Sequence, residues 1–173
     1  MLNITSGDIL AVRGRGFFSR GILRITGGPV THVGIVLATD PEPLAIEALW
    51  RVKTRPLAKS IEDAEAAWIL SPLNLTKTHR AIIVAVACDY SADDYGWWDI
   101  GLQLLDAAFR TTWFTDHALW AIRRFPIYSF LVAEVYGNEG LTFGNKQEQS
   151  TTPADIYHFA VQNPDKYAIT RIK

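Results

Sequence analysis

The chain has 173 residues, of which 49% are hydrophobic and 20% charged. This balance suits a folded domain with a sizeable core and argues against disorder. The length lies within the range of about 100–200 residues for one domain, so we expect residues 1–173 to form a single domain. The formal net charge of -1 gives no electrostatic reason to expect nucleic acid or acidic membranes as partners.

The sequence shows no secretion or membrane signal. The first ten residues, MLNITSGDIL, lack a basic region followed by a long apolar run, so we expect a cytoplasmic location, with a virion or another delivered location as the alternative. The longest apolar run, residues 81–88, is far shorter than the roughly 20 residues of a membrane helix, so no transmembrane segment is expected. The single cysteine, Cys88, excludes an intrachain disulfide.

The first half of the chain is dominated by strand patterns. Alternation and β-branched residues predict strands, and an apolar helical spacing that stops at Gly27 and Gly28 predicts one helix, residues 17–26. Pro56 indicates that the strand containing it lies at an edge of the sheet. The predicted strands are residues 8–13, 31–39, 44–50, 52–61 (the edge strand) and 66–72.

The second half is helical. Apolar faces predict helices over residues 78–90 and 128–140, and one or two more within residues 97–124. A Thr-Pro-Asp entry predicts a last helix from residue 151. The expected fold is α+β, with a small antiparallel sheet or partial barrel packed against segregated helices.

His32 and Glu47 are the first candidate site residues. Glu47 stands among apolar neighbours in AIEAL, where an unpaired buried carboxylate is costly. If the strands around residues 31–39 and 44–50 form a hairpin, the two side chains come side by side. A carboxylate hydrogen-bonded to one imidazole nitrogen fixes the tautomer and leaves the other nitrogen as a base. The alternative is an ordinary core or surface histidine.

The order of motifs resembles that of a known superfamily. GDILAVRGRG, GGPVTHVGIVL and AIEAL, then YSFLVAEVY and TTPADIY, are similar to segments of the circularly permuted NlpC-type papain-like cysteine hydrolases, relatives of the lecithin:retinol acyltransferases. That resemblance implies a permuted papain-like fold, a histidine strand first and the nucleophile helix late. It also places the segment GRGFFSRG close to His32.

The resemblance departs at the nucleophile. The family pattern Cys-Ser-x-Leu-Val-x-x-x-Tyr is matched at Ser129, Leu131, Val132 and Tyr136, but Tyr128 stands where the cysteine is expected. A phenol with an ordinary pKa near 10 does not replace a thiolate. We therefore expect Tyr128 to fill the former nucleophile site and to bond to His32.

No other side chain replaces that cysteine well. Ser129 is a weak candidate nucleophile, since one step along a helix turns the side chain by about 100°. Cys88 lies among apolar residues, where a buried, inert thiol is expected. His79 and His117 are expected to be solvated, and His158 follows Tyr157 in the tail. The four histidines have no metal-ligand spacing, so neither metal nor cofactor is expected.

Tryptophans gather in residues 97–124, an expected helical insert that matches the family pattern least. Trp113 and Trp120 are either helix-packing residues or a surface that contacts lipid, glycan or protein.

Three functions remain open. The first is a papain-like module that has lost thiol hydrolase activity and now binds or supports, with a cell-wall peptide or lipid ligand in its cleft and a protein partner on the insert. The second is an active amidase, esterase or acyltransferase on cell-wall peptides or lipids, with His32 as base and an unconventional nucleophile. The third is a virion or envelope assembly component.

Overall fold

The structure, a computed structural model, describes residues 4–48, 52–90, 128–144 and 151–173. Six strands form one antiparallel sheet in the order β4-β3-β2-β1-β5-β6. From β1 to β4, each strand pairs with the next one in the chain, with a helix in the connection between β1 and β2, so the first half of the chain builds most of the sheet. The strands are β1 (Ile9–Gly14), β2 (His32–Ala38), β3 (Leu44–Ala48), β4 (Val52–Pro56), β5 (Ala64–Pro72) and β6 (Tyr167–Arg171).

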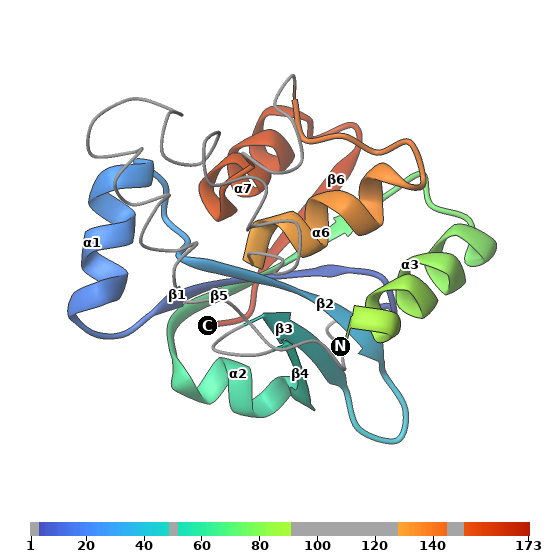
Figure 1. Cartoon of the computed structure of the whole chain (residues 1–173), viewed down its shortest axis with the longest axis horizontal. Coiled ribbons are helices and arrows are strands. Elements are labelled where there is room, and N and C mark those ends of the chain that lie inside the picture. Colours follow the sequence, from blue (N-terminus) through green and yellow to red (C-terminus); the bar gives the residue numbers. More distant parts are fainter. Residues whose placement is uncertain (1–3, 49–51, 91–127, 145–150) are drawn as a thin grey trace, which may run out of the picture.

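Helices cover both faces of this sheet. In the view of Figure 1, α3, α6 and α7 lie above the sheet and α2 lies below it, while α1 stands at one end of the molecule. The α+β class is confirmed. Within the described residues, no helix has the length and apolar character that crossing a bilayer requires. The helices are α1 (Phe17–Thr26), α2 (Leu57–Asp63), α3 (Lys77–Asp89), α6 (Tyr128–Gly137) and α7 (Pro153–Gln162).

Strand alternation divides the apolar residues into two cores. On one face, Ile9, Val33 and Ile35 of the sheet pack with α6 residues such as Leu131 and Val135. On the other face, a second core holds residues of β1, β2, β3, α2 and β5, namely Leu10, Val12, Val36, Ala45, Leu57, Ala64, Ala67 and Ile69. Different helices therefore pack on the two faces, and the face to which a strand side chain points decides which helix it meets.

Several helix ends follow their sequence signals. Gly27, with a φ of 67°, adopts the left-handed conformation that ends α1, as expected from a glycine stop. Thr152 and Asp155 form a reciprocal capping box at the start of α7, with Pro153 in the first turn. The predicted helix entries and stops at these positions are confirmed.

Two elements differ from the sequence predictions. The predicted edge strand over residues 52–61 is wrong beyond Pro56, because the chain turns there into α2. Leu57 and Ile61, four residues apart, pack that helix on the second core. The C-terminal strand β6 was not predicted; it completes the sheet by pairing with β5.

A buried carboxylate ties the ends of several elements together. Asp8 has no solvent exposure, and its Oδ1 accepts a hydrogen bond of 2.7 Å from Arg80 Nη1 of α3. Its Oδ2 accepts hydrogen bonds from Ser71 Oγ at 2.8 Å and from the backbone of Thr5 at 2.9 Å. Arg80 also donates to the carbonyl of Pro72 at 2.9 Å. Asp8 therefore joins the start of β1 to the end of β5 and to α3.

Replacing Asp8 by alanine should destabilise the fold by about 3–5 kcal/mol, since it leaves the Arg80 guanidinium partly buried without its counter-charge. Chemical denaturation of the wild type and of Asp8→Ala measures this loss. Asp63→Ala is the control: Asp63 pairs with cations at a surface where its side chain is 49% exposed, and a change of about 0.5 kcal/mol or less is expected. Equal losses in the two variants would contradict the anchoring role of Asp8.

Candidate functional site

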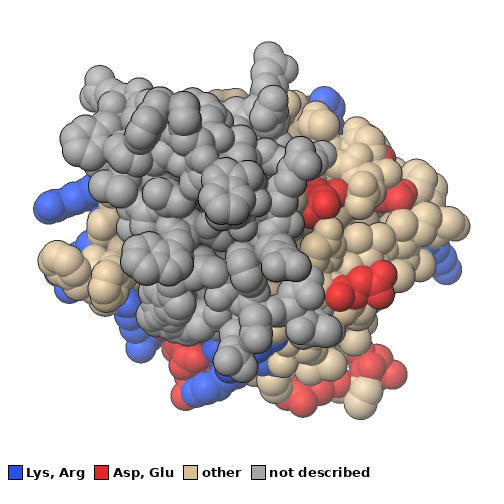
Figure 2. Space-filling model, in the orientation of Figure 1, with Lys and Arg blue, Asp and Glu red and all other residues tan. Residues whose placement is uncertain are grey.

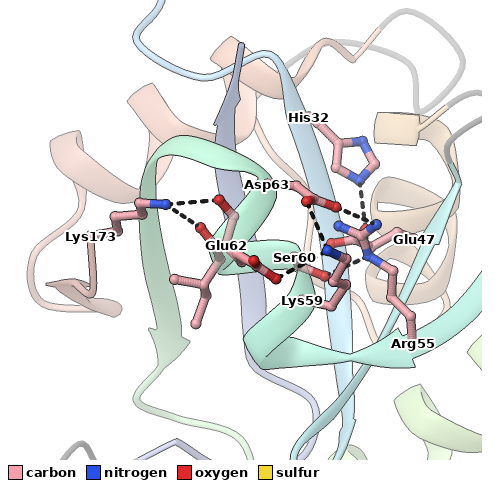
Figure 3. Close-up of polar contacts among 9 residues, drawn as sticks. His32, Glu47, Arg55, Lys59, Ser60, Glu62, Asp63 and Lys173 are labelled. Carbon is pink, nitrogen blue, oxygen red and sulfur yellow. Dashed lines mark hydrogen bonds and ion pairs between the residues drawn. The ribbon is translucent and has the colours of Figure 1, made fainter.

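His32 and Glu47 lie side by side on one face of the sheet. In the β2–β3 pairing Gly34 stands opposite Glu47, so His32, two residues earlier, is diagonal to Glu47 on the same face. The distance from His32 Nε2 to Glu47 Oε2 is 3.8 Å, and the side chains are 10% and 1% exposed. Figure 3 shows the imidazole pointing toward the carboxylate and Arg55.

Gly34 makes room for this arrangement. A β-carbon added at Gly34 would meet the carbonyl oxygen of Ile46 at 2.6 Å and Cγ of Glu47 at 2.9 Å. The Glu47 side chain therefore lies over Gly34, in the space that a larger residue would occupy between His32 and Val36. The glycine of the His-Val-Gly stretch is part of the site.

Arg55 of β4 neutralises the Glu47 carboxylate. Its Nε lies 3.0 Å from Glu47 Oε2 and donates a hydrogen bond of 2.8 Å to Ser60 Oγ of α2. Its Nη1 lies 3.3 Å from Asp63 Oδ2, and Lys59 Nζ lies 3.3 Å from Asp63 Oδ1. A chain of alternating charges thus leads from buried Glu47 to the surface of α2 (Figure 3).

The C-terminal residue holds α2 in place. Lys173 Nζ donates hydrogen bonds to the carbonyls of Ile61 and Glu62 at 2.8 and 3.0 Å, as Figure 3 shows. These are carbonyls of the last turn, where a cation is favoured by the helix dipole. The contact fixes the helix that carries Ser60 and Asp63, and so supports Arg55.

The electrostatic surroundings keep His32 neutral. Burial lowers the pKa of the His32 imidazole below its ordinary value of 6.5; Glu47 opposes this effect, and Arg55 adds to it. The 3.8 Å between His32 Nε2 and Glu47 Oε2 is longer than a hydrogen bond, so the carboxylate–imidazole hydrogen bond expected from the sequence is not formed here. The negative charge of Glu47 is compensated by Arg55 instead.

The pair and the body of α6 lie on opposite faces of the sheet. His32 alternates with Val33, and Glu47 with Ile46, and both apolar residues belong to the core that contains α6. On the other side, Val36 and Ala45 share the face of His32 and Glu47 and pack with α2. The site is therefore built by the sheet and α2.

Tyr128 is the first residue of α6, but its side chain lies outside the described residues, so its expected bond to His32 stays a prediction. Ser129 is fully buried, and its Oγ forms no hydrogen bond with a residue of the described ranges. A buried hydroxyl without an aligned base does not suit a nucleophile.

The prediction of a buried Cys88 is wrong. Ile83 and Ala87 are the buried residues of α3, and Cys88 is exposed. One step beyond Ala87 turns the side chain by about 100°, away from the core. The core that α3 joins lies on the opposite face of the sheet from His32.

The remaining predicted candidates do not join the site. Trp113, Trp120, His117 and the expected insert over residues 97–124 lie outside the described residues. His158 is exposed, and His79 is half-buried, with its Nε2 lying 4.0 Å from Glu139 Oε2. In the part of the chain that the structure describes, no group of three His, Cys, Asp or Glu side chains could hold a metal ion.

Arg55 is the site residue that sequence reasoning missed. Its signal was the alternation of VKTRP after AIEAL: Glu47 pairs with Lys53, and Arg55 is the next residue on that face. The sequence alone left open the β3–β4 register that brings Arg55 beside Glu47.

A cleft of about 310 Å³ lies elsewhere, between the β5–β6 end of the sheet and the segment after α6. It includes none of the predicted site residues; among its lining residues are Leu75, Leu141, Phe159 and Tyr167.

Comparisons with known proteins support the fold. No family model matches the chain, and no curated protein matches it. Among solved structures, the crystal structure of metalloprotein yiiX from Escherichia coli O157:H7, DUF1105, is similar, with a TM-score of 0.68 over 98% of this chain and 96% of that chain. The two chains share a fold. Their sequence identity is 16%, so the similarity extends to the fold alone.

The Arg55–Glu47 pair gives a direct stability prediction. Arg55→Met should cost about 3 kcal/mol of unfolding free energy, because it leaves a buried carboxylate without a counter-charge. In an Arg55→Met, Glu47→Gln double variant this loss should be partly recovered, with a coupling of about 1 kcal/mol or more. Denaturant unfolding of the wild type, Arg55→Met, Glu47→Gln and the double variant measures the coupling.

The matched control is Lys59→Met, which removes only surface ion pairs of a side chain that is 54% exposed. It should change stability by about 0.5 kcal/mol or less. Additive effects of the Arg55 and Glu47 substitutions would contradict the pairing.

Proposed function

We propose that this chain is a papain-like-fold protein that does not use thiol chemistry and that acts as a binding or structural module. The observation that carries the proposal is the state of Glu47. Its carboxylate is buried beside His32, yet its charge is compensated by Arg55 rather than directed to the imidazole. This arrangement buries a polar pair on the sheet without activating a nucleophile.

The position of the thiol supports the same proposal. The family pattern has a cysteine where this sequence has Tyr128, and the chain's one cysteine is exposed on α3. Thiol hydrolysis needs a thiolate in contact with a base. His32 faces α2, on the other side of the sheet from the core that α3 joins, so Cys88 does not supply that thiolate.

Unused hydrogen-bonding capacity favours a binding role. Both carboxylate oxygens of Glu47 are buried, and within the described ranges neither accepts a hydrogen bond, since Arg55 contributes an ion pair only. Buried polar atoms are normally satisfied, and an exception in a native protein often marks a function. A ligand with an N–H or O–H donor would satisfy Glu47. Cell-wall peptides and lipids with amide or hydroxyl headgroups, the classes implied by the resemblance, carry such donors.

A second candidate, an amidase, esterase or acyltransferase with an unconventional nucleophile, is favoured by one observation. Burial keeps His32 neutral, and a neutral imidazole can accept a proton. This candidate lacks a nucleophile: the Ser129 hydroxyl is buried, and a tyrosine phenol at position 128 ionises far above neutral pH.

A metal cofactor does not fit the described site residues. The similar E. coli protein is described as a metalloprotein, and His32 with Glu47 offers an imidazole and a carboxylate as ligands. However, Arg55 Nε lies 3.0 Å from Glu47 Oε2, where its positive charge would repel a bound cation. Two ligands beside a guanidinium do not make a cation site, so we derive no step through a metal.

The proposal predicts that the wild type does not turn over muropeptides or short-chain thioesters and oxyesters above the rate of a His32→Ala variant. Product release is followed by chromatography for peptides and by absorbance for esters. Calorimetric titration of the same muropeptides tests binding, which should weaken about tenfold or more in Glu47→Ala if a ligand donor meets this carboxylate.

Two further variants separate the alternatives. Turnover in Tyr128→Cys that is lost in Tyr128→Cys with His32→Ala would indicate a cleft that lacks only its thiol. Wild-type turnover that disappears in His32→Ala would contradict the proposal and favour the enzyme candidate.

A further inference from the structure

Helix α1 presents an apolar stripe to solvent. Phe17 and Phe18 are 84% and 81% exposed, Ile25 is 38% exposed, and no residue of the helix is buried. Phe17, Gly21 and Ile25 recur every four residues, so they align along one side of the helix, with Phe18 next to them. Adjacent exposed phenylalanines are unusual on a protein surface and indicate a contact site.

All charged residues in the segment that contains this stripe are positive. Residues 13–26 contain four arginines and no acidic residue. Arg13 Nη1 lies 3.7 Å from Glu65 Oε1, so its charge is compensated. Arg15, Arg20 and Arg24 are exposed, and no acidic side chain of the described residues forms an ion pair with them.

Two of these arginines border the stripe. A turn of about 100° per residue places Arg20 and Arg24 beside Phe17 and Gly21 on the helix surface. In Figure 2, the end of the molecule where Figure 1 places α1 shows blue and tan atoms, and the red atoms of this view lie elsewhere. We call the set of Phe17, Phe18, Ile25, Arg15, Arg20 and Arg24 the α1 face.

The α1 face stands on a fixed base. The backbone N–H of Gly14 donates to Thr31 Oγ1 at 2.8 Å, and that of Thr31 donates to the carbonyl of Val12 at 2.8 Å. Arg13 Nε donates to the carbonyl of Pro29 at 2.8 Å. These bonds close the segment between β1 and β2 at its foot. Both ends of the segment that carries α1 are therefore tied to the sheet, which lowers the ordering cost of docking.

We propose that the α1 face docks this protein on the surface of an anionic lipid bilayer. Phe17, Phe18 and Ile25 enter the boundary between headgroups and acyl chains, and Arg15, Arg20 and Arg24 contact lipid phosphates. An amphipathic helix with aromatic residues on one side and basic residues at its border binds membrane interfaces in this way. Arginine stems lie along apolar surface while the guanidinium bonds phosphate oxygens.

Charge favours a bilayer over a second copy of this chain. A two-fold dimer through the α1 face would bring the same three arginines of both copies together, and their like charges would repel. A phosphate-rich plane complements them. The inference is independent of the proposed function, but it has a consequence for the site: α1 ends at Thr26 and His32 begins the next strand, so docking brings the His32 strand near the lipid.

The test is co-sedimentation of the full chain with vesicles of phosphatidylcholine plus phosphatidylserine, and with vesicles of phosphatidylcholine alone. The wild type should bind the anionic vesicles, and added salt should weaken binding. Phe17→Ser with Phe18→Ser, and separately Arg20→Gln with Arg24→Gln, should each weaken binding about tenfold or more. Thermal unfolding should be unchanged, because the substituted side chains are exposed.

The matched control is Leu73→Ser with Val161→Ser, which removes two apolar side chains outside α1 that are 53% and 49% exposed. It should bind as the wild type does. The proposal is overturned if the wild type does not bind anionic vesicles, or if the phenylalanine variant binds them equally well. Sedimentation velocity that reveals a dimer dependent on Phe17 and Phe18 would likewise overturn it and assign the face to self-association.

Discussion

The buried charge of Glu47 is the constraint on which the site depends. A carboxylate that is 1% exposed must meet a compensating charge, and Arg55 on the neighbouring strand supplies it at 3.0 Å. Arg55 in turn binds Ser60 and Asp63 of α2, and Lys173 fixes the last turn of that helix. The edge of the sheet, α2 and the C-terminus thus form one polar assembly around the carboxylate. His32 stands beside it and is left neutral.

The fold handles the buried carboxylate of Asp8, the residue before β1, differently. Asp8 accepts hydrogen bonds from Arg80, Ser71 and the backbone of Thr5, so its polar capacity is used within the fold. Glu47 receives charge compensation from Arg55, but its oxygens accept no hydrogen bond within the described residues. The contrast separates a structural carboxylate from one with capacity for a ligand, and it is why we assign the binding role to the His32–Glu47 face.

Local signals predicted the fold well, and contacts between distant elements did not follow from them. The strands around Ile9 and Val33, the Gly27 helix stop and the Thr152–Asp155 cap depend on short-range chemistry, and each was found from the sequence. Residues 57–61 were misassigned because a short amphipathic helix and an edge strand give similar patterns, and packing on the second core decides between them. The strand at Tyr167–Arg171 exists through its pairing with β5.

For the site as well, local patterns predicted single residues, and contacts between distant elements did not follow from the sequence. An apolar strand interrupted by a glutamate indicated that Glu47 needs a partner, and the hairpin indicated His32. Arg55 could be recognised as the main counter-charge only from the register of β3 against β4, which no pattern in the sequence fixes. Cys88 was expected to be buried from the apolar character of its neighbours, but a helix has an exposed side even in an apolar run, and Cys88 lies on it.

The most direct measurement of this account is an NMR titration of the His32 imidazole in nitrogen-15-labelled protein, with its signals assigned by their loss in His32→Gln. If burial and Arg55 dominate its surroundings, His32 titrates below its ordinary pKa of 6.5 and stays neutral at pH 7. A pKa at or above 6.5 would mean that Glu47 stabilises the imidazolium rather than pairing with Arg55. That result would contradict the account and return His32 and Glu47 to the status of an activated pair.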